Sequence, residues 1–340
     1  MTVIHRDIFK TDILSQLVFQ SGVQAEKDAA TRVHFHDGYA YTFDDERINM
    51  KPCPIDYSGT APIKLLIASL GGTEEEINVT WKGDKKTELK LIVKNGNSRS
   101  VFKGTPANVD ILAQHDVSTL KWHKVDQDLL EYQELLEATV SKNVTNFQLS
   151  SIHCTPDYFQ AASEAQICRV MHSLPKDFEF LIRYGVIKNI FKGATSVART
   201  KEYMYFQYGE GLVTGIRIFE EKYLASIPKQ IEKERTGICI ELPSELSEAI
   251  KTAELFTDEN QSVVCSMGEG VFAIKTQNAM GSYIAKAKVD YMGETKSFML
   301  KAKVLASVLE MGHKCLVTEE AIRIEDPGTL IFLTSIISQD

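Results

Sequence analysis

The sequence lacks the patterns that mark most metal proteins and nucleotide hydrolases. Its six cysteines form no C-x-x-C pair, and none of them is spaced with the eight histidines as metal ligands usually are. No G-x-x-x-x-G-K-[ST] phosphate loop is present. We therefore expect no cofactor or metal, no catalytic site, and no hydrolysis of a nucleotide by this chain.

Long apolar runs are also missing. None approaches the roughly 20 residues that span a membrane, and the first residues, MTVIHRDIFK, do not form a signal peptide. We expect a cytoplasmic protein with reduced thiols. The sequons at Asn78 and Asn143 are then chance matches rather than glycosylation sites.

The sequence has fewer basic residues than acidic ones, 38 against 46. The chain of 340 residues has a net charge of −8, with 44% hydrophobic and 25% charged residues. This argues against a generally basic nucleic-acid-binding coat, although a basic surface could be segregated from an acidic one. The length is too great for one ordinary core and suits two or three domains.

What the chain does have is a pattern that recurs. Residues 297–311, SFMLKAKVLASVLEM, predict a helix with four apolar residues on one face, and strands over 315–318, 321–326 and 329–336 follow it. Turn signals at Glu319-Glu320 and Pro327-Gly328 separate these strands. The apolar residues on that face are Val304, Leu305, Val308 and Leu309.

The same order of elements occurs twice more. Comparable helices are predicted within 59–72 and 174–193, so the three helices lie about 115 and 125 residues apart. A second helix opens each third of the chain, and these helices begin about 119 and 117 residues apart. They cover residues 7–22, 126–141 and 243–256.

This pattern predicts an α+β fold of three repeated domains, each with two helices on an antiparallel sheet. The period is too long for a solenoid repeat, and each repeat has enough strands and amphipathic helices for a core of its own. We place the domains at 1–115, 116–228 and 229–340. Three unrelated α+β domains would agree in order and spacing only by accident.

At these residues the chain resembles the bacterial DNA sliding clamps, the β-subunit processivity factors of DNA polymerase III. The resemblance covers almost the whole chain and is strongest from Tyr223 to the end. Each stretch is weak alone, but their order and spacing are specific, and the divergence indicates a viral or otherwise distant member. The stretches are VFKGTPANVDI, YLASIPKQIEK, SELSEAIKTAELFTDEN, DYMGETKSFMLKAKVLASVLE and AIRIEDPGTLIFLTSI.

The resemblance implies a head-to-tail homodimeric ring around duplex DNA, with helices lining the hole. Cationic side chains in or beside the predicted helices would contact phosphates without reading sequence, which allows sliding. Any one of them could equally lie on a solvated helix face. The candidates are Arg6, Lys10, Lys27, Lys64, Lys142, Lys176, Arg183, Lys188, Lys192, Lys251, Lys301 and Lys303.

The resemblance also implies two protein contacts. Ring closure would use Phe102 on an edge strand together with Leu255 and Phe256 at a helix end. A groove between the second and third domains would receive apolar anchors of short peptides from DNA polymerase and other partners. Its residues would be Leu149, Cys168, Pro228, Ile331, Phe332 and Leu333. Ordinary core packing would account for the ring-closing residues too, and a plain core strand would account for the terminal apolar run.

The chain departs from the family pattern at its C-terminus, and two alternative functions remain open. The family usually ends in Pro-Met, a basic residue and Leu, whereas this chain has Thr334-Ser335-Ile336-Ile337, so its peptide preference could differ. Because no phosphate loop is present, a separate ATPase loader or spontaneous opening is implied. The first alternative is a clamp-fold adaptor that recruits proteins without encircling DNA. The second is an enzyme, for which neither His34 with His36 nor His153 with Cys154 offers a defensible site.

Overall fold

The computed structural model describes residues 2–18, 31–44, 46–55, 57–72, 74–83, 88–125, 132–141, 143, 145–183, 193–257, 261–310 and 314–337. These fall into two compact units. Unit 1 comprises Met1–Val125 and Gly185–Ile218, and unit 2 comprises Asp126–Tyr184 and Phe219–Asp340. Both units include parts of the middle predicted domain, and the predicted domain boundaries stay a prediction. Within the described residues, no helix is long and apolar enough to cross a membrane.

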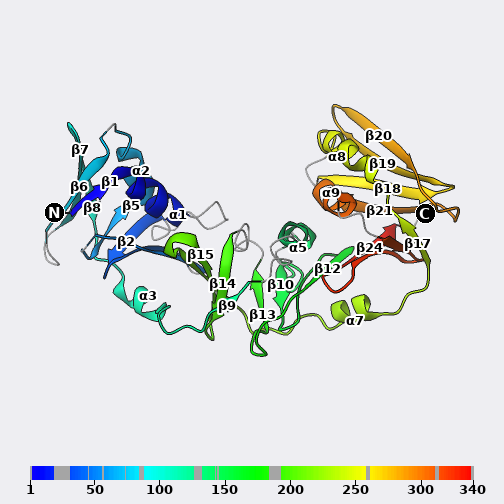
Figure 1. The fold of residues 1–340 in the computed structure, drawn as a ribbon, viewed down its shortest axis with the longest axis horizontal. Coiled ribbons are helices and arrows are strands. Elements are labelled where there is room, and N and C mark those ends of the chain that lie inside the picture. The colour runs from blue at the N-terminus through cyan, green and yellow to red at the C-terminus, as the bar shows by residue number, and fades with distance from the viewer. Residues whose placement is uncertain are drawn as a thin grey trace. The chain divides into compact units, whose positions relative to one another are not determined.

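Unit 1 contains two antiparallel sheets, with strand orders β1-β6-β7-β8 and β5-β2-β3-β4-β16-β15-β14-β9 (Figure 1). The strands are β1 Thr2–His5, β2 Arg32–His36, β3 Tyr39–Phe43, β4 Arg47–Pro52, β5 Gly59–Pro62, β6 Glu76–Lys82, β7 Leu89–Asn95, β8 Ser98–Gly104, β9 His123–Lys124, β14 Ala194–Arg199, β15 Tyr203–Tyr208 and β16 Val213–Arg217. The helices are η1 Ile8–Leu14, α1 Ser15–Leu17, α2 Ile63–Ser69, α3 Val109–Gln114 and η3 Gly209–Gly211.

The core of unit 1 forms where the first helices meet the strands. Phe9, Leu14 and Leu17 of η1 and α1 are fully buried and pack with strand residues such as Phe35 and with Leu66 of α2. In the sequence Ile13, Leu14, Leu17 and Val18 share one helical face, which predicts a helix here, although η1 is wound as a π-helix.

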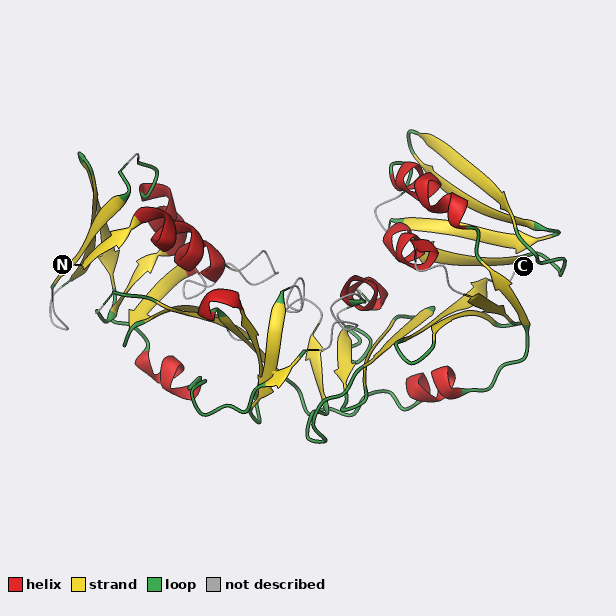
Figure 2. Cartoon of the chain, in the orientation of Figure 1, coloured by secondary structure: helices red, strands yellow, loops and turns green. Residues whose placement is uncertain are grey.

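Unit 2 is built on one antiparallel sheet of twelve strands, whose main path is β13-β10-β11-β12-β24-β21-β18-β19-β20. Strands prevail over helices here as in unit 1 (Figure 2). The strands are β10 Ser151–Cys154, β11 Tyr158–Ala162, β12 Gln166–Met171, β13 Phe180–Arg183, β17 Ile238–Glu241, β18 Ser262–Gly268, β19 Val271–Asn278, β20 Gly281–Lys288, β21 Lys296–Lys301, β22 Lys314–Val317, β23 Ala321–Asp326 and β24 Leu330–Ile337.

The helices of unit 2 are placed by their apolar faces. They are α5 Gln133–Thr139, α7 Ser226–Glu232, η4 Ser244–Leu246, α8 Ser247–Glu254 and α9 Ala302–Glu310. Helices α8 and α9 pack against each other and on the sheet, and α5 packs on β11 and β12. The four predicted face residues of α9, Val304, Leu305, Val308 and Leu309, are all buried, as the period of 3.6 residues requires.

The fold confirms most of the predicted elements and corrects the starts of three helices. The segments predicted to open the helices at residues 59 and 297 lie in strands β5 and β21, and the segment from residue 174 is a loop and turn followed by strand β13. In β13, Phe180, Leu181 and Ile182 are all buried, and such a short unbroken apolar run has no period that separates strand from helix. The remainder of the predicted 174–193 helix, residues 184–192, lies outside the described residues.

All six cysteines are free thiols, and five of them are buried. Burial raises the pKa of Cys53 to about 11 and raises the pKa of Cys154, Cys168, Cys265 and Cys315 further. Cys239 on β17 is exposed. The predicted reduced thiols are therefore compatible with the fold, and the five buried thiols are shielded from reagents in water.

Candidate protein-binding and nucleic-acid-binding sites

An apolar cluster in unit 2 lies between helix α7 and one face of the large sheet. Ile231 of α7 packs with Leu149, Ile167 and Leu333, each less than 10% exposed. Leu224, Ile227 and Ile331 are partly exposed at its margin, and Ala162 and Ala321 complete it. We call these nine residues the α7 cluster.

The residues predicted to form a peptide groove divide between two faces of this sheet. Leu149, Ile331 and Leu333 belong to the α7 cluster, and Pro228 lies in the first turn of α7. Cys168 and Phe332 are opposite each other in the ladder, are fully buried, and point to the other face, where Cys168 contacts Thr139 of α5. Successive strand residues face opposite sides, so Phe332 and Leu333 cannot line one groove.

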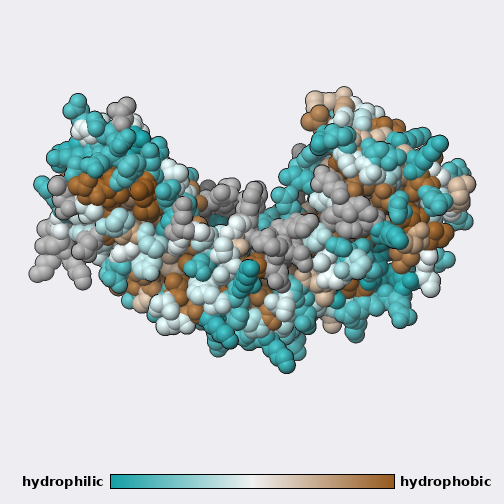
Figure 3. All heavy atoms as spheres, viewed as in Figure 1, coloured by the Kyte–Doolittle hydropathy of each residue, from teal (hydrophilic) through white to brown (hydrophobic). Residues whose placement is uncertain are grey.

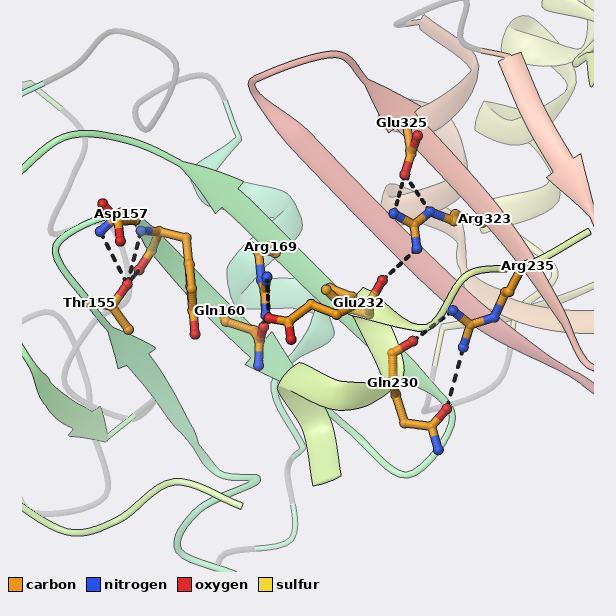
Figure 4. Close-up of polar contacts among 11 residues, drawn as sticks. Thr155, Asp157, Gln160, Arg169, Gln230, Glu232, Arg235, Arg323 and Glu325 are labelled. Atoms are coloured by element: carbon orange, nitrogen blue, oxygen red, sulfur yellow. Dashed lines mark hydrogen bonds and ion pairs between the residues drawn. The ribbon is translucent and has the colours of Figure 1, made fainter. Parts of the chain in front are cut away.

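A polar network that the sequence did not indicate adjoins the α7 cluster. The register of the sheet places Gln160 of β11 beside Arg169 of β12, and Arg169 beside Ile331. The Arg169 side chain is 7% exposed. Its Nε donates to Gln160 Oε1 at 2.8 Å, and its Nη1 lies 3.3 Å from Glu232 Oε1 at the end of α7 (Figure 4). The guanidinium also covers the Tyr158 ring at 4.0 Å, which is a favourable cation–π contact.

Two further arginines bind the C-terminal end of α7. Arg323 of β23 donates from Nη1 to the carbonyl of Ile231, and Arg235 donates from Nη1 to the carbonyl of Gln230 at 2.7 Å (Figure 4). Carbonyls at a helix C-terminus lack partners within the helix and carry partial negative charge. Cations from two directions therefore hold this end of the helix in place.

The network continues to an aromatic pair and an open pocket. His153 stacks on Tyr223 with ring centroids 4.6 Å apart, and burial, with the nearby Arg169 charge, lowers the pKa of His153 to about 4. Arg169 and Tyr158 also line a pocket of about 670 Å³ with Met171 and His172. The neutral imidazole avoids a second buried cation beside Arg169.

The predicted DNA-contacting cations have different surroundings. Lys10, Lys64, Lys176 and Lys303 form no ion pair with any described residue, and the last three are exposed. Arg6 donates to Asp7 and to the carbonyl of Gly72. Lys27, Lys142, Lys188 and Lys192 lie outside the described residues.

Three of the predicted cations are engaged within unit 2. Lys251 pairs with Glu248 at 2.8 Å on the exposed surface of α8. Lys301 ends strand β21 and donates to the carbonyl of Ala138. Arg183 ends β13 and lies over the rings of Phe147 and Phe219, at 5.4 and 5.7 Å. Phosphate binding by these three would require them to leave their present contacts.

The predicted ring-closing residues lie on or beside the end strands of two sheets. β8 carries Phe102 and ends the four-stranded sheet of unit 1, and β20 ends the large sheet of unit 2. Phe102 is 9% exposed and packs in the core. Leu255 is 73% exposed, and Phe256 stacks on Tyr283 of β20 with centroids 6.0 Å apart. Leu255 is therefore the exposed apolar side chain of the three.

Among the described residues, no group of three or more His, Cys, Asp or Glu side chains could hold a metal ion. His34 and His36 lie on strand β2 as expected, and the Nδ1 atom of His34 accepts a hydrogen bond from the backbone N–H of Asn108.

Comparisons of sequence and of structure give different results. No family model and no curated protein matches the sequence. The structure, however, is similar over nearly its full length to solved bacterial proteins. A C. crescentus beta sliding clamp has a TM-score of 0.75 at 12% identity and covers 99% of this chain and 98% of its own.

Two further structures agree with the first. The DNA polymerase III subunit beta from Pseudomonas aeruginosa has a TM-score of 0.71 at 11% identity and covers 98% of this chain and 99% of its own. The DNA polymerase III beta subunit from Thermotoga maritima has a TM-score of 0.70 at 14% identity and covers 99% of both chains. The chain described here therefore has the fold of the bacterial DNA polymerase III beta sliding clamps.

Proposed function

We propose that this chain is a sliding clamp, a non-enzymatic cytoplasmic processivity factor that encircles duplex DNA and tethers a DNA polymerase. The observation that carries the proposal is the full-length match of fold to bacterial clamps, at a TM-score of up to 0.75 over 98–99% of both chains. Unrelated proteins can share one domain of similar fold, so a match over a single domain would be weak support for a shared function. Here the match to the clamps extends over three successive domain-sized regions, which is stronger support.

Ring closure in this proposal joins β8 of one chain to β20 of a second copy. Each strand ends its sheet, so one of its edges is not paired with any strand that the structure describes, and such edges readily add another strand. The exposed Leu255 and the nearby Phe256 and Phe102 would supply apolar contacts at this seam. Because the contact is head-to-tail, two copies close a ring only if the rotation between them allows it.

DNA would lie against the helices, where the exposed cations Lys64 of α2 and Lys303 of α9 would contact phosphates with the half-exposed Lys10 of η1. Long lysine side chains attract phosphates without reading bases. Topological linkage then keeps the ring on DNA, so that high affinity is not needed. A separate ATPase loader would open the seam.

Partner peptides would enter the α7 cluster. In the present conformation Ile231 is 1% exposed and Leu333 is 6% exposed, so an apolar anchor has to displace α7 residues to reach the sheet. Leu224, Ile227 and Ile331, which are partly exposed, offer the first contacts. A DNA polymerase would attach here through a short segment with one or two apolar side chains.

The decisive experiment measures retention on circular DNA. Purified protein is loaded on a nicked circular plasmid, isolated by gel filtration, and then treated with a restriction enzyme that makes one cut. A clamp stays on the circle and slides off the linear product, whereas a protein bound by charge stays on both. Equal retention on circular and linear DNA, or no retention on either with an active loader present, would contradict the proposal.

A clamp-fold adaptor that no longer encircles DNA is the second candidate. It is favoured by the engagement of Lys251, Lys301 and Arg183 within unit 2. The combined change of Lys10, Lys64 and Lys303 to Glu separates the candidates. For a clamp we expect polymerase processivity to fall about tenfold or more, while an adaptor would recruit its partners and support the polymerase unchanged.

A further inference from the structure

The sheet formed by β18, β19, β20 and β21 has one covered face and one open face. On the covered face Val263, Phe272, Ile274, Phe298 and Leu300 are buried, and helix α8 contacts β19 and β20 while α9 contacts β21. On the other face side chains are exposed, with apolar and hydrophilic residues both present on the surface of this region (Figure 3). We call this second side the outer face.

The outer face carries positive charge and no negative charge. Lys275 on β19 and Lys286 and Lys288 on β20 are exposed and make no ion pair with any residue that the structure describes. The four strands contain no aspartate or glutamate, in a chain with 46 acidic residues and a net charge of −8. Acidic residues occur beyond the strand ends, at Glu269, Asp290 and Glu294.

Exposed aliphatic side chains lie in one row with Lys275. The register of the ladder forms one cross-strand row, Met299–Val264–Lys275–Ile284. Met299 is 42% exposed, Val264 37% and Ile284 55%. Residues paired across antiparallel strands have adjacent side chains, so the row is a nearly continuous apolar strip that contains one lysine.

Lys275 lies within this strip and Lys286 lies beside it, close enough for the two charges to act together. Lys286 is paired with Ala273 and so is the diagonal neighbour of Lys275, a separation of roughly 7–8 Å between Cα atoms. Like charges at this distance repel each other when no anion lies between them. An anionic partner would remove this repulsion while covering the strip, which is the energetic basis for binding.

The chemistry of the outer face favours a protein partner over a nucleic acid. Single-stranded nucleic acid is usually bound with aromatic side chains or arginine that stack on bases, and the four strands have no arginine. Their aromatic residues, Phe272, Tyr283 and Phe298, belong to the covered face, where Phe272 and Phe298 are buried and Tyr283 stacks on Phe256. Aliphatic side chains beside lysines suit a segment in which acidic and aliphatic residues alternate.

We propose that the outer face of β18–β21 is a docking surface for an acidic, aliphatic segment of a partner protein. Acidic residues of the segment pair with Lys275, Lys286 and Lys288, and its aliphatic residues cover Val264, Ile284 and Met299. This surface does not include the residues of the α7 cluster, and it uses a face of the sheet rather than the backbone edge of β20.

The test uses a fluorescent peptide of alternating glutamate and leucine, with fluorescence anisotropy as the readout. The variant changes Lys275, Lys286 and Lys288 to Glu, and the matched control reverses three other exposed lysines, Lys121, Lys201 and Lys222. We expect peptide affinity to fall about tenfold or more in the first and to stay within about twofold in the control. Circular dichroism verifies that both proteins are folded.

Two further measurements test the role of the apolar strip and the class of ligand. Ile284→Ser keeps all charges and should weaken peptide binding by about threefold or more. Oligo(dT) of the same net charge should bind more weakly than the peptide. The proposal is wrong if the peptide does not bind, if the control loses as much affinity as the variant, if Ile284→Ser has no effect, or if oligo(dT) binds the same lysines more tightly.

Discussion

Acidification should destabilise unit 1 by an amount that the structure allows to be calculated. His34 and His115 are both buried, and burial lowers the pKa of each imidazole to about 4 from 6.5. His34 accepts the backbone N–H of Asn108 at Nδ1, and His115 Nδ1 lies 2.7 Å from Tyr205 Oη. Protonation of His34 at Nδ1 would break its hydrogen bond and leave a buried charge.

The sign of the effect follows from linkage. A histidine whose pKa is lower in the folded state takes up its proton first in the unfolded chain, so folding is fully supported above pH 6.5 and loses support as the pH falls toward 4. At about pH 5.5 this amounts to roughly 1 kcal/mol for each histidine. The two histidines together should lower the free energy of unfolding of unit 1 by roughly 2 kcal/mol relative to about pH 7.5.

The assay can use intrinsic fluorescence because both tryptophans, Trp81 and Trp122, belong to unit 1. Urea unfolding followed by tryptophan emission at the two pH values gives the difference for this unit. The variant His115→Gln removes one titrating group and should reduce the pH dependence by about half. If the free energy of unfolding changes by less than about 1 kcal/mol between the two pH values, or if the variant keeps the full dependence, the reasoning is wrong.

Three further predictions concern other parts of the molecule. Arg169→Met should destabilise unit 2 by about 2–3 kcal/mol, because the buried Gln160 Oε1 atom loses its charged donor. Glu232→Gln should cost less than about 1 kcal/mol, because the Glu232 side chain is 61% exposed. Urea unfolding followed by circular dichroism compares the free energies of unfolding of the two variants, and tryptophan emission should be unchanged in both. Gly237→Ala should destabilise unit 2 in the same assay, since an added Cβ would lie 2.1 Å from the carbonyl oxygen of Val317, and a neutral result would show that β17 can shift freely. Finally, the β8 and β20 edges both carry cations and β20 has no acid, so added salt should strengthen homodimer formation by screening; weaker association in sedimentation at higher salt would contradict this.

The elements with a clear period were predictable from the sequence. Leu246, Ile250 and Ala253 share a helical face in the sequence and are all buried in η4 and α8. The sequence predicts a helix from residue 297, but these residues form strand β21, in which Phe298 and Leu300 are buried and Met299 between them is exposed. That alternation is the period of a strand, and it was obscured because the helix α9 follows without a break.

The candidate sites were less predictable, because they depend on which face of a sheet each residue occupies. The predicted groove placed Phe332 and Leu333 together, yet adjacent strand residues face opposite sides. The Arg169 network could not be foreseen, since Gln160 and Glu232 are brought to it by strand register and by the position of α7. Neither is encoded in a local sequence pattern.

The burial of five cysteines gives the native chain a practical property. A thiol-reactive dye should attach at Cys239 and leave the other thiols untouched while the protein is folded. The label would sit in unit 2, whereas the natural emitters Trp81 and Trp122 sit in unit 1. Dye emission and tryptophan emission would therefore report separately on unit 2 and unit 1, without any engineered cysteine.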